Sequence, residues 1–434
     1  MRRISWSLRI LAVSAGVMTV LAAENIDIAD ISEPEDVILP RMIPNAVDVR
    51  GIGMGKMGVA LAEGAHGIFV NPAIPASLEK SAVQAGARLK FGTISDEYAE
   101  SELSGSEACE KLSVKPTNVA AAVPIIIPAL PLSLAAGVGY HSAYDFTENL
   151  YSMQPGSERT TRIRGGLELV SPAVSLGLMD RYFFGVAVNV SVFNKLTVKQ
   201  ENTGLPEETE EFDGSAVFAT LGALAKPIEK LTVGLGYQPH FEWDYEKQTY
   251  EVARVLTAGV HYQIMEQLGV GAEVQPRLLS ELTREDGELD NGIALRGGAE
   301  YLLGPVAVRA GGFYEAVPRT DLDFRNERAV SDEPKYIAGA GLGIGVPVKT
   351  VRVDVGGMWS RFTREEKYDR HPGPGTDTYT YAENDYRVDL GVSVELPPLA
   401  FRERKFEDVT PDTTLGPAID EPGRRKPIYG PEDM

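Results

Sequence analysis

Three glycines near the N-terminus have the spacing of a phosphate-binding turn. In GIGMGKMGVALAEGAHGIFVNPA, residues 51 to 73, Gly53, Gly55 and Gly58 follow the order G-x-G-x-x-G. A dinucleotide-binding turn needs a hydrophobic strand before it and a helix after it, because the pyrophosphate contacts the N-terminus of that helix. The preceding segment here is acidic and interrupted by prolines, and only a short helix-compatible stretch follows. The spacing therefore does not predict a nucleotide site.

Other residues that could perform chemistry are scattered along the chain. The five histidines (66, 141, 240, 261 and 371) have no common spacing, no GxSxG nucleophile motif is present, and Cys109 is the only cysteine. A single cysteine excludes an intramolecular disulfide and argues against a cysteine zinc site. No second histidine stands at ligand spacing from His66, which favours a packed structural role for this side chain. The sequence predicts a protein that is not an enzyme and has no metal or cofactor.

The charge balance limits the class of partner. The net charge is −20, from 62 acidic and 42 basic side chains. This balance argues against nucleic acid as a partner, because the phosphates would be repelled. Glycine, with 44 residues, exceeds its usual share of about 7%. High glycine with ordinary hydrophobicity suits strands that carry bulky residues on one face and small residues on the other.

The first 23 residues have the order of a secretory signal peptide. Three arginines precede an uncharged apolar run from Ile10 to Ala23, and small residues close it. The run is shorter than the about 20 residues that a transmembrane helix needs. No cysteine follows it, so a lipid anchor is not predicted. Residues 1–23 are therefore expected to direct export and to be removed after Ala22 or Ala23.

Bulky and small side chains alternate with period two from about residue 80 to residue 397, as in strands with two different faces. In RYFFGVAVNVSVFNK, for example, Phe184, Val186 and Val188 share one face, while Gly185 and Ala187 share the other. Runs of this kind predict fourteen strands, at 80–94, 117–127, 131–146, 160–178, 181–200, 212–226, 231–248, 251–265, 268–282, 290–303, 305–320, 333–347, 350–366 and 377–396.

The small face distinguishes between two all-β folds. A soluble β-sandwich or propeller would have a polar outer face, whereas the non-bulky face here is dominated by Gly and Ala with few charges. The links alternate between short ones, such as Met179-Asp180 and Glu266-Gln267, and mostly longer ones, such as 200–213. Outer-membrane barrels have short periplasmic turns and longer outer loops. We therefore predict an all-β fold, a 14-stranded antiparallel transmembrane β-barrel over residues 80–397 with both termini in the periplasm.

Two segments lie outside the predicted barrel. Residues 24–79 lack the period-two pattern and are long enough to enter the lumen as an N-terminal plug. Residues 398–434 are rich in proline and charge and have little to bury. Such a composition predicts a disordered periplasmic C-terminal tail.

With a barrel behind it, the glycine stretch resembles the N-terminal signature of the outer-membrane family of long-chain fatty acid transporters, the FadL/TodX type. Members carry a Gly-rich and Ala-rich segment that leads through Asp-Ala-Ser into Asn-Pro-Ala. The departures here are Glu63-Gly64-Ala65-His66, where Asp-Asp-Ala-Ser is usual, and Val70, where an aromatic residue is common. The matching residues form a plug motif of Gly53, Gly55, Gly58, Asn71, Pro72 and Ala73.

The resemblance implies an outer-membrane transporter for passive uptake of hydrophobic molecules such as long-chain fatty acids or aromatic hydrocarbons. Two alternatives stay open. One is a PorV-like shuttle or scaffold of a type nine secretion system, which the same family resembles, and the other is a general porin, which would lack a plug. The expected partners are a hydrophobic small molecule, outer-membrane lipid and, during insertion, the barrel assembly machinery. The chain itself is expected to be a monomer.

Inward-facing cations are the candidate ligand-binding residues. A cation with hydrogen-bond donors can hold a fatty carboxylate while apolar neighbours cover the chain. The alternative is that these cations pair with inward acids across the strands and with the plug, which would brace a polar interior. Parity and topology place five of them in the outer half of the lumen: Arg88, Lys90, Arg162, Arg164 and Arg296.

The fourth predicted strand implies a break in the barrel wall. In its first half Leu167 and Leu169 share odd parity with Glu168 opposite, whereas the apolar residues of its second half have even parity. Both halves can present apolar residues to lipid only if an extra residue is inserted between them. Because Pro172 cannot donate to the ladder, we predict a wall kink at Ser171, Pro172 and Ala173. In the resembled family such a kink is a side exit for ligand, and the Pro124 region is the alternative place for one here.

Overall fold

The computed structural model describes thirteen stretches of the chain. They are residues 48–61, 63–98, 106–109, 113–127, 132–145, 148–154, 157–192, 195–202, 208–245, 248–278, 291–317, 335–369 and 376–397. The expected signal peptide (1–23), residues 24–47 and the expected tail (398–434) lie outside the described residues.

Fourteen long strands within the described stretches form an antiparallel barrel, which confirms the predicted fold class. The predicted strands correspond one by one to those observed. They are β1 (Ser81–Tyr98), β3 (Ser113–Ile127), β4 (Leu132–Asp145), β7 (Gly166–Leu178), β8 (Tyr182–Ser191), β11 (Val217–Ile228), β12 (Leu231–Gln238), β15 (Val255–Met265), β16 (Leu268–Arg277), β17 (Gly292–Leu303), β18 (Val306–Val317), β19 (Lys335–Val348), β20 (Val351–Asp369) and β21 (Thr376–Leu396).

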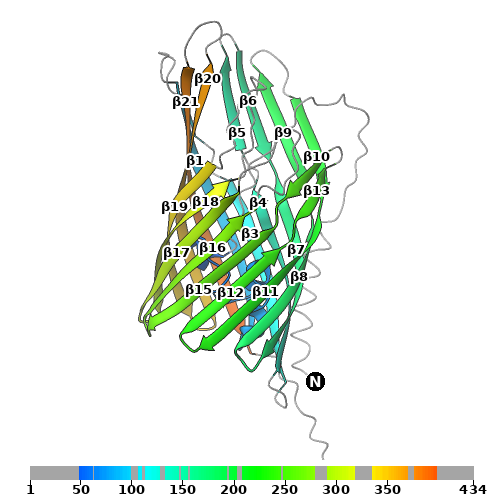
Figure 1. The fold of residues 1–434 in the computed structure, drawn as a ribbon, viewed down its shortest axis with the longest axis vertical. Helices are drawn as coiled ribbons and strands as arrows, with labels where there is room; N and C mark the ends of the chain where they lie inside the picture. Colours follow the sequence, from blue (N-terminus) through cyan, green and yellow to red (C-terminus); the bar gives the residue numbers. More distant parts are fainter. Residues whose placement is uncertain are drawn as a thin grey trace, which may run out of the picture. The chain divides into compact units, whose positions relative to one another are not determined.

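The sheet closes at β1. This strand pairs with β21 on one side, from Ser81↔Leu396 to Tyr98↔Tyr379, and with β3 on the other, from Ala82↔Ala122 to Lys90↔Ser113. The other barrel strands pair with their sequence neighbours in the barrel (Figure 1). Closure satisfies the backbone groups of the two terminal strands, which a bilayer would otherwise leave without partners.

Seven further strands extend the barrel strands at the end opposite the tight turns (Figure 1). The short β2 (Ser106–Cys109) pairs with the end of β1. The other six form a separate sheet in the order β14-β13-β10-β9-β6-β5. Their bounds are β5 (Glu148–Gln154), β6 (Ser157–Arg164), β9 (Lys195–Asn202), β10 (Glu208–Ser215), β13 (Phe241–Tyr245) and β14 (Gln248–Val252).

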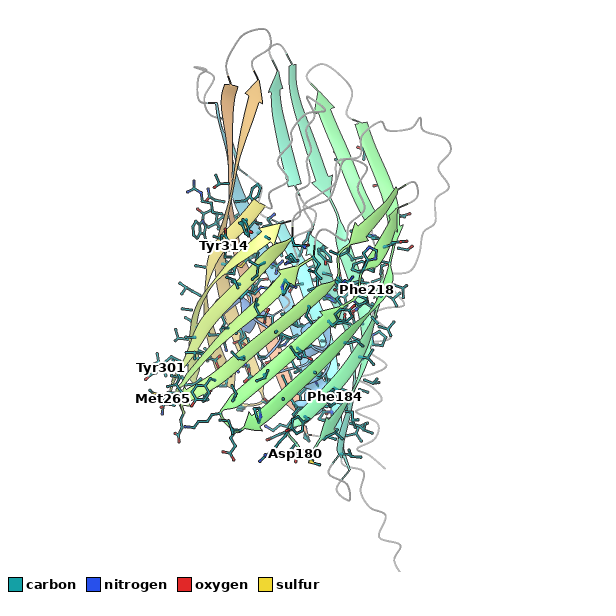
Figure 2. The ribbon with its side chains drawn as sticks, viewed as in Figure 1. Asp180, Phe184, Phe218, Met265, Tyr301 and Tyr314 are labelled. Atoms are coloured by element: carbon teal, nitrogen blue, oxygen red, sulfur yellow. The ribbon has the colours of Figure 1, made fainter. Side chains whose placement is uncertain are left out.

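The two faces of each barrel strand differ as the period-two pattern predicts. In β8, Phe183, Ala187 and Asn189 are buried, whereas Phe184 and Val188 are exposed. The exposed apolar side chains of many strands project from the outer face of the barrel (Figure 2). An outward apolar band of this kind is what a lipid-facing barrel surface requires.

Tight turns join several strand pairs at one end of the barrel. Met179 and Asp180 between β7 and β8 have φ of 55° and 53°, and Lys349 between β19 and β20 has φ of 60°. Positive φ matches the right-handed twist of the two strands that such a turn joins. These turns lie where the sequence predicts short links.

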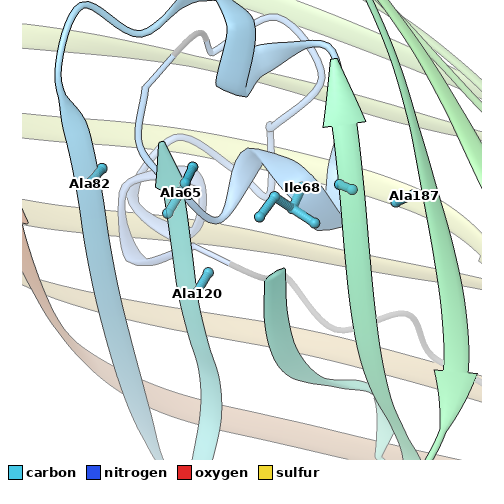
Figure 3. Close-up of a cluster of buried hydrophobic side chains, with 7 residues drawn as sticks. Ala65, Ile68, Ala82, Ala120 and Ala187 are labelled. Carbon is cyan, nitrogen blue, oxygen red and sulfur yellow. The ribbon is translucent and has the colours of Figure 1, made fainter. Parts of the chain in front are cut away.

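The N-terminal segment forms three short helical turns inside the barrel. They are α2 (Val49–Gly53), α3 (Gly67–Val70) and the 3-10 turn η1 (Ile74–Ser77). Ala65 and Ile68 pack against Ala82, Ala120 and other small wall residues (Figure 3). Among the described residues, none of the helices is long and apolar enough to cross a bilayer.

Candidate functional site

The N-terminal segment, residues 48–78, contacts the barrel wall through two different regions. α2 contacts β18, β19, β20 and β21, while α3 and η1 contact strands between β3 and β8. We call this segment the plug. Asp48 begins it: its carboxylate accepts a hydrogen bond from the N–H of Gly51 at 3.2 Å and caps α2.

The first two motif glycines lie where the plug backbone passes closest to the wall. A Cβ at Gly53 would lie 3.1 Å from Cα of Gly343, and one at Gly55 would lie 2.4 Å from the carbonyl oxygen of Gly312. Gly55 also has φ of +75°, which side chains other than glycine rarely adopt. Gly58 instead faces Val70 within the plug, 2.8 Å from its Cγ1. Gly53 and Gly55 therefore serve close packing of the plug backbone against the wall, and Gly58 leaves room for the Val70 side chain.

The Asn-Pro-Ala part of the motif ties the plug to the opposite wall. Asn71 is fully buried, and its Nδ2 donates to the carbonyl oxygens of Val59 at 2.8 Å and Ala223 at 3.0 Å. Its Oδ1 accepts from the N–H of Ala73 at 3.2 Å. A Cβ at Gly185 of β8 would lie 2.0 Å from the carbonyl oxygen of Pro72. This wall therefore accommodates the plug only because small residues line it.

One group of ion pairs joins α2 to β17, β18 and β20. The guanidinium of Arg50 donates to both carboxylate oxygens of Glu300, at 3.1 and 2.8 Å. Arg309 contacts the same carboxylate at 2.5 Å and that of Asp354 at 2.7 Å. Arg50 also pairs with Glu63 of the plug at 2.7 Å. These buried charges hold α2 in one position, because removing any of them leaves its partners uncompensated.

A second group of ion pairs lies on the next turn of the plug. Nζ of Lys56 contacts Glu315 at 2.6 Å, and Arg296 contacts Glu315 at 2.7 Å and Glu273 at 2.5 Å. The other oxygen of Glu273 accepts from the backbone N–H groups of Gly58 and Val59. Burial lowers the pKa of Lys56 to about 8, although the carboxylate of Glu315 opposes the shift. Two cations and two carboxylates leave this group without net charge.

His66 connects the two ends of the plug to β1. Its Nε2 lies 3.1 Å from the Asp48 carboxylate, and its Nδ1 lies 2.6 Å from Oε1 of Gln84. The backbone N–H of His66 donates to the same Oε1 at 2.8 Å, which fixes the orientation of that amide. Both ring nitrogens therefore face acceptors. Only the protonated ring can donate a hydrogen bond from each nitrogen. Burial acts to lower the pKa of His66, but Asp48 outweighs it and holds the pKa above its usual value.

The predicted ligand-binding cations are engaged by acids wherever the structure describes their side chains. Arg88 contacts Asp389 at 2.9 Å and Lys90 lies 3.5 Å from Asp385, both across the β1–β21 ladder. Arg296 belongs to the second group of ion pairs described above. The backbones of Arg162 and Arg164 pair with β9, and their side chains lie outside the described part of the structure. The alternative role of bracing thus accounts for Arg88, Lys90 and Arg296.

A cavity lies between the plug and the wall strands β11, β12, β15, β16 and β17. Its volume is about 140 Å³. Apolar lining comes from Met57, Phe69, Val70 and Val255. Polar lining comes from Gln238 and Gln275 and from the charged residues Asp48, Lys56, Glu273 and Arg296. An apolar cavity of about 150 Å³ is large enough to hold benzene. This space therefore accommodates a ligand the size of one aromatic ring.

Arg277 lies one inward position beyond Gln275 on β16. Its side chain is 7% exposed, and Nε has no hydrogen-bond partner among the described residues. Within the same part of the chain it forms no ion pair, unlike Arg296 beside it. The carboxylate of Glu315 attracts the Arg277 charge, but it already pairs with Lys56 and Arg296. Arg277 therefore shares a carboxylate with two other cations, two positions along β16 from Gln275 of the cavity lining.

The wall around Ser171, Pro172 and Ala173 differs from the predicted kink. β7 keeps one alternation throughout, and Leu167 and Leu169 are 0% and 1% exposed on the inner face. Glu168 instead lies on the outer face, where it accepts a hydrogen bond from the Tyr140 hydroxyl. The expectation that these leucines face lipid and Glu168 the lumen is therefore wrong. A side-chain-filled lumen accepts leucine as a bilayer does, so apolar alternation alone does not identify the outer face.

The ladders on both sides of β7 are irregular, and the one on the β8 side is broken at the predicted residues. An extra residue of β4 lies between Ser142 and Tyr144. Towards β8, pairing is interrupted at Ser171 and Pro172, and it resumes at Ala173↔Ala187 in unchanged register. The Ser171 hydroxyl donates to Oδ1 of Asn189 at 2.6 Å, and Asn189 donates to Thr220 at 2.8 Å. Side-chain bonds thus bridge β7, β8 and β11 where the backbone ladder is interrupted.

Comparison with known proteins gives a fold-level match. No family model and no curated protein matches the sequence. A Pseudomonas aeruginosa FadL homologue has 16% sequence identity and a TM-score of 0.59, over 82% of this chain and 100% of that one. The Pseudomonas putida toluene transporter TodX has 12% identity and a TM-score of 0.55, over 80% and 97%. The Ralstonia pickettii toluene transporter TbuX has 12% identity and a TM-score of 0.53, over 80% and 98%.

The chain has the FadL fold. Identities this low show the architecture alone, so the residues of the lumen must be interpreted from their own contacts. Among the residues that the structure describes, no group of three or more His, Cys, Asp or Glu side chains could hold a metal ion.

Sequence analysis did not select Arg277, whose Nε has no hydrogen-bond partner among the described residues. Arg277 shares odd parity with Glu273 and Gln275, which was a usable signal for an inward side chain. The sequence did not show which basic side chains form ion pairs with acidic ones. Glu315, for example, neutralises both Lys56 of the plug and Arg296 of the wall, two residues that lie 240 positions apart in the chain.

Proposed function

We propose that this chain is an outer-membrane channel for passive uptake of hydrophobic molecules, including ligands with an anionic end. The observation that carries the proposal is the cavity between the plug and the wall, lined by Met57, Phe69 and Val70 and by Gln275, which precedes Arg277 by two positions on β16. The lining combines these apolar residues with charged ones, such as Lys56 and Glu273, and apolar walls with a few polar groups are typical of a ligand site. The FadL fold and the outward apolar band support a location in the outer membrane.

The anionic end of the ligand is held by Arg277 in this proposal, and not by the five cations expected from the sequence. Arg88, Lys90 and Arg296 already contact carboxylates, so binding a second anion there would require breaking an ion pair. At Arg277 an incoming carboxylate replaces no partner among the described residues. A charge-assisted hydrogen bond forms there at the lowest cost.

Uptake of two ligands in cells that lack their own channel tests the proposal. The wild-type chain is expected to restore uptake of both oleate and toluene. Arg277→Gln is expected to weaken oleate binding at least tenfold and to leave toluene uptake unchanged, while Arg277→Lys retains part of the oleate binding. Lys80→Gln, which removes a cation from an exposed pair with Glu395, is the matched control. Equal loss for both ligands would show that Arg277 only braces the wall.

A further inference from the structure

Exposed aromatic side chains gather in two places on the outer face of the barrel. One group lies near the tight turns, on β8, β15 and β17: Tyr182, Phe184, Tyr262 and Tyr301. Among the side chains that the structure describes, the other exposed Phe, Tyr and Trp residues lie at the opposite end, on β1, β18, β20 and β21: Phe91, Tyr314, Trp359 and Tyr386. Figure 2 shows Tyr314 at that end and Tyr301 near the turns. Barrels of this class have aromatic girdles at both interfaces, but the second group here is confined to one side.

This second group forms a row across neighbouring strands. Phe91 is opposite Tyr386, and Tyr386 is opposite Trp359, in the ladders of β1, β21 and β20. The rings of Phe91 and Tyr386 are stacked, with centroids 5.3 Å apart and planes inclined by 8°. On β18 and β19, the rings of Tyr314 and Tyr336 are stacked with centroids 4.6 Å apart. We call these five rings the aromatic platform.

A cation lies among the rings of the platform. Arg361 follows Trp359 by two positions on the same face of β20, and its side chain is exposed. The register of the two ladders makes Tyr336 and Tyr386 its diagonal neighbours, which aromatic side chains can reach. Within the described part of the chain, Arg361 has no hydrogen bond and no ion pair. Its guanidinium group is therefore available to an anion from outside the protein.

The platform and Arg361 lie at one edge of the apolar band. Arg361 follows Val351, the first residue of β20 after a tight turn, by ten positions. With about 2.6 Å of height per residue in a tilted strand, it stands about 26 Å from the turn, whereas the apolar band of such barrels is about 25 Å tall. Short turns face the periplasm in barrels of this class. On that orientation, Arg361 meets the head groups of the outer leaflet.

The strands that carry the platform continue beyond this edge. β20 and β21 stay paired from Arg361↔Asn384 to Asp369↔Thr376, and β1 and β21 stay paired as far as Tyr98↔Tyr379. At the same rise per residue, the hairpin of β20 and β21 extends about 20 Å past Arg361. A lipid with an extended head group would have a continuous sheet beside it, which the small head group of a glycerophospholipid is too short to follow.

We propose that this face of the barrel binds a phosphorylated glycolipid of the outer leaflet. A guanidinium group matches a phosphate with two parallel hydrogen bonds, and the C–H face of a sugar packs on an aromatic ring. The sugar phosphate contacts Arg361, the sugars contact the aromatic platform and the acyl chains lie on the apolar band. Because the chain has a net charge of −20, it repels anionic lipid in general, and Arg361 provides a specific contact.

Binding of purified lipids to the full chain tests the proposal. The probe is lipid A, a diphosphorylated glucosamine disaccharide with acyl chains, and binding is measured by native mass spectrometry in detergent. Lipid A is expected to bind at least tenfold more tightly than its dephosphorylated form or phosphatidylglycerol. Arg361→Gln is expected to weaken lipid A binding at least tenfold, whereas Arg361→Lys retains part of it because the charge remains.

Two further variants separate charge from ring faces. Arg254→Gln removes an exposed cation that precedes Met265, the last residue of β15, by eleven positions, and so lies at a similar height outside the platform. It is expected to leave lipid A binding unchanged. The double variant Trp359→Leu, Tyr386→Leu keeps apolar side chains but removes two rings. It is expected to weaken lipid A binding at least fivefold and to leave phosphatidylglycerol binding unchanged.

Equal affinity of the wild-type chain for lipid A and phosphatidylglycerol would overturn the glycolipid site, because it would indicate attraction to any anionic lipid. Equal losses in Arg361→Gln and Arg254→Gln would overturn it as well. The proposal does not depend on the proposed function, and the two fail separately. Specific lipid A binding without uptake of oleate or toluene would refute the proposed function alone, whereas normal uptake without specific lipid A binding would refute the glycolipid site alone.

Discussion

The two halves of the barrel wall hold the plug by different interactions. Strands β16 to β21 contact it through glycines and also through buried ion pairs, such as Arg50 with Glu300 and Lys56 with Glu315. Strands from β3 to β15 contact it through alanines, glycines and the amide of Asn71. We call these the charged half and the apolar half.

We infer that the charged half anchors the plug and that ligand moves along the apolar half. Ion pairs in a buried site depend strongly on distance and direction, so a shift of the plug on the charged half leaves charges unpaired. Contacts between small apolar residues have no preferred direction, so a shift along the apolar half costs mainly packing. The cavity borders the apolar half at β11, β12 and β15. The interrupted ladder of β7–β8 also belongs to this half.

The largest expected effect is on the charged half. Glu300→Gln removes the carboxylate shared by Arg50 and Arg309 and leaves two buried guanidinium groups undercompensated. We expect it to lower the free energy of unfolding by about 3–5 kcal/mol and to raise dye leakage. Urea unfolding in lipid vesicles measures the first and dye efflux the second. Glu395→Gln, which removes only an exposed pair with Lys80, is the control. Equal losses in both variants would mean that the ion pairs do not anchor the plug.

A smaller effect is expected from His66, which links the plug to β1 at the boundary between the halves. The pKa of His66 is raised in the folded state. Its contribution to the free energy of unfolding is therefore fully present below the pKa of about 6.5 in the unfolded chain. This contribution is lost as the pH rises through the pKa of His66 in the folded protein. Loss of one charge-assisted hydrogen bond costs about 1.5–3 kcal/mol. The pKa of Asp48 is held well below its usual range, so Asp48 stays charged throughout this interval.

Hydrogen exchange of the plug amides between pH 6 and pH 8 measures this contribution. Exchange is expected to accelerate with pH, beyond the intrinsic rate, in the wild type and not in His66→Gln. Lys56, whose pKa is lowered to about 8, titrates in part of the interval with the opposite sign. The difference between the two proteins therefore isolates His66. Identical pH profiles would show that His66 does not act as a charged link.

The smallest effect is expected on the wall of the apolar half. Pro172→Val supplies the missing N–H at the interruption between β7 and β8, and one added hydrogen bond is worth about 0.5–1.5 kcal/mol. Uptake is expected to stay within twofold of the wild type, because the Ser171 and Asn189 side chains already bridge the strands. A large fall in uptake would show that ligand passes the wall at this position.

The barrel could be predicted from the sequence because its signal is local. Alternation within β8 or β21 identifies a strand without knowledge of its partner. The sequence could not predict in the same way which side chains of β7 point into the barrel. Leu167 and Leu169 are equally suited to lipid and to a filled interior. The ion pairs of Arg296 and the absence of a partner for Arg277 depend on side chains from distant strands. Period-two patterns carry no information about such contacts.

Two engineered disulfides test most directly whether ligand moves along the apolar half. In a Cys109→Ser background, cysteines at Val49 and Gly391 join the plug to β21, where a Cβ on Gly391 lies 3.4 Å from that of Val49. Cysteines at Ala60 and Gly259 join it to β15, with the corresponding distance 3.5 Å. Both are close to the about 3.8 Å typical of disulfides. We predict that oxidising the Ala60–Gly259 pair lowers toluene uptake at least tenfold and reversibly, while the Val49–Gly391 pair leaves it unchanged. Loss of uptake with the Val49–Gly391 bridge alone would contradict the account.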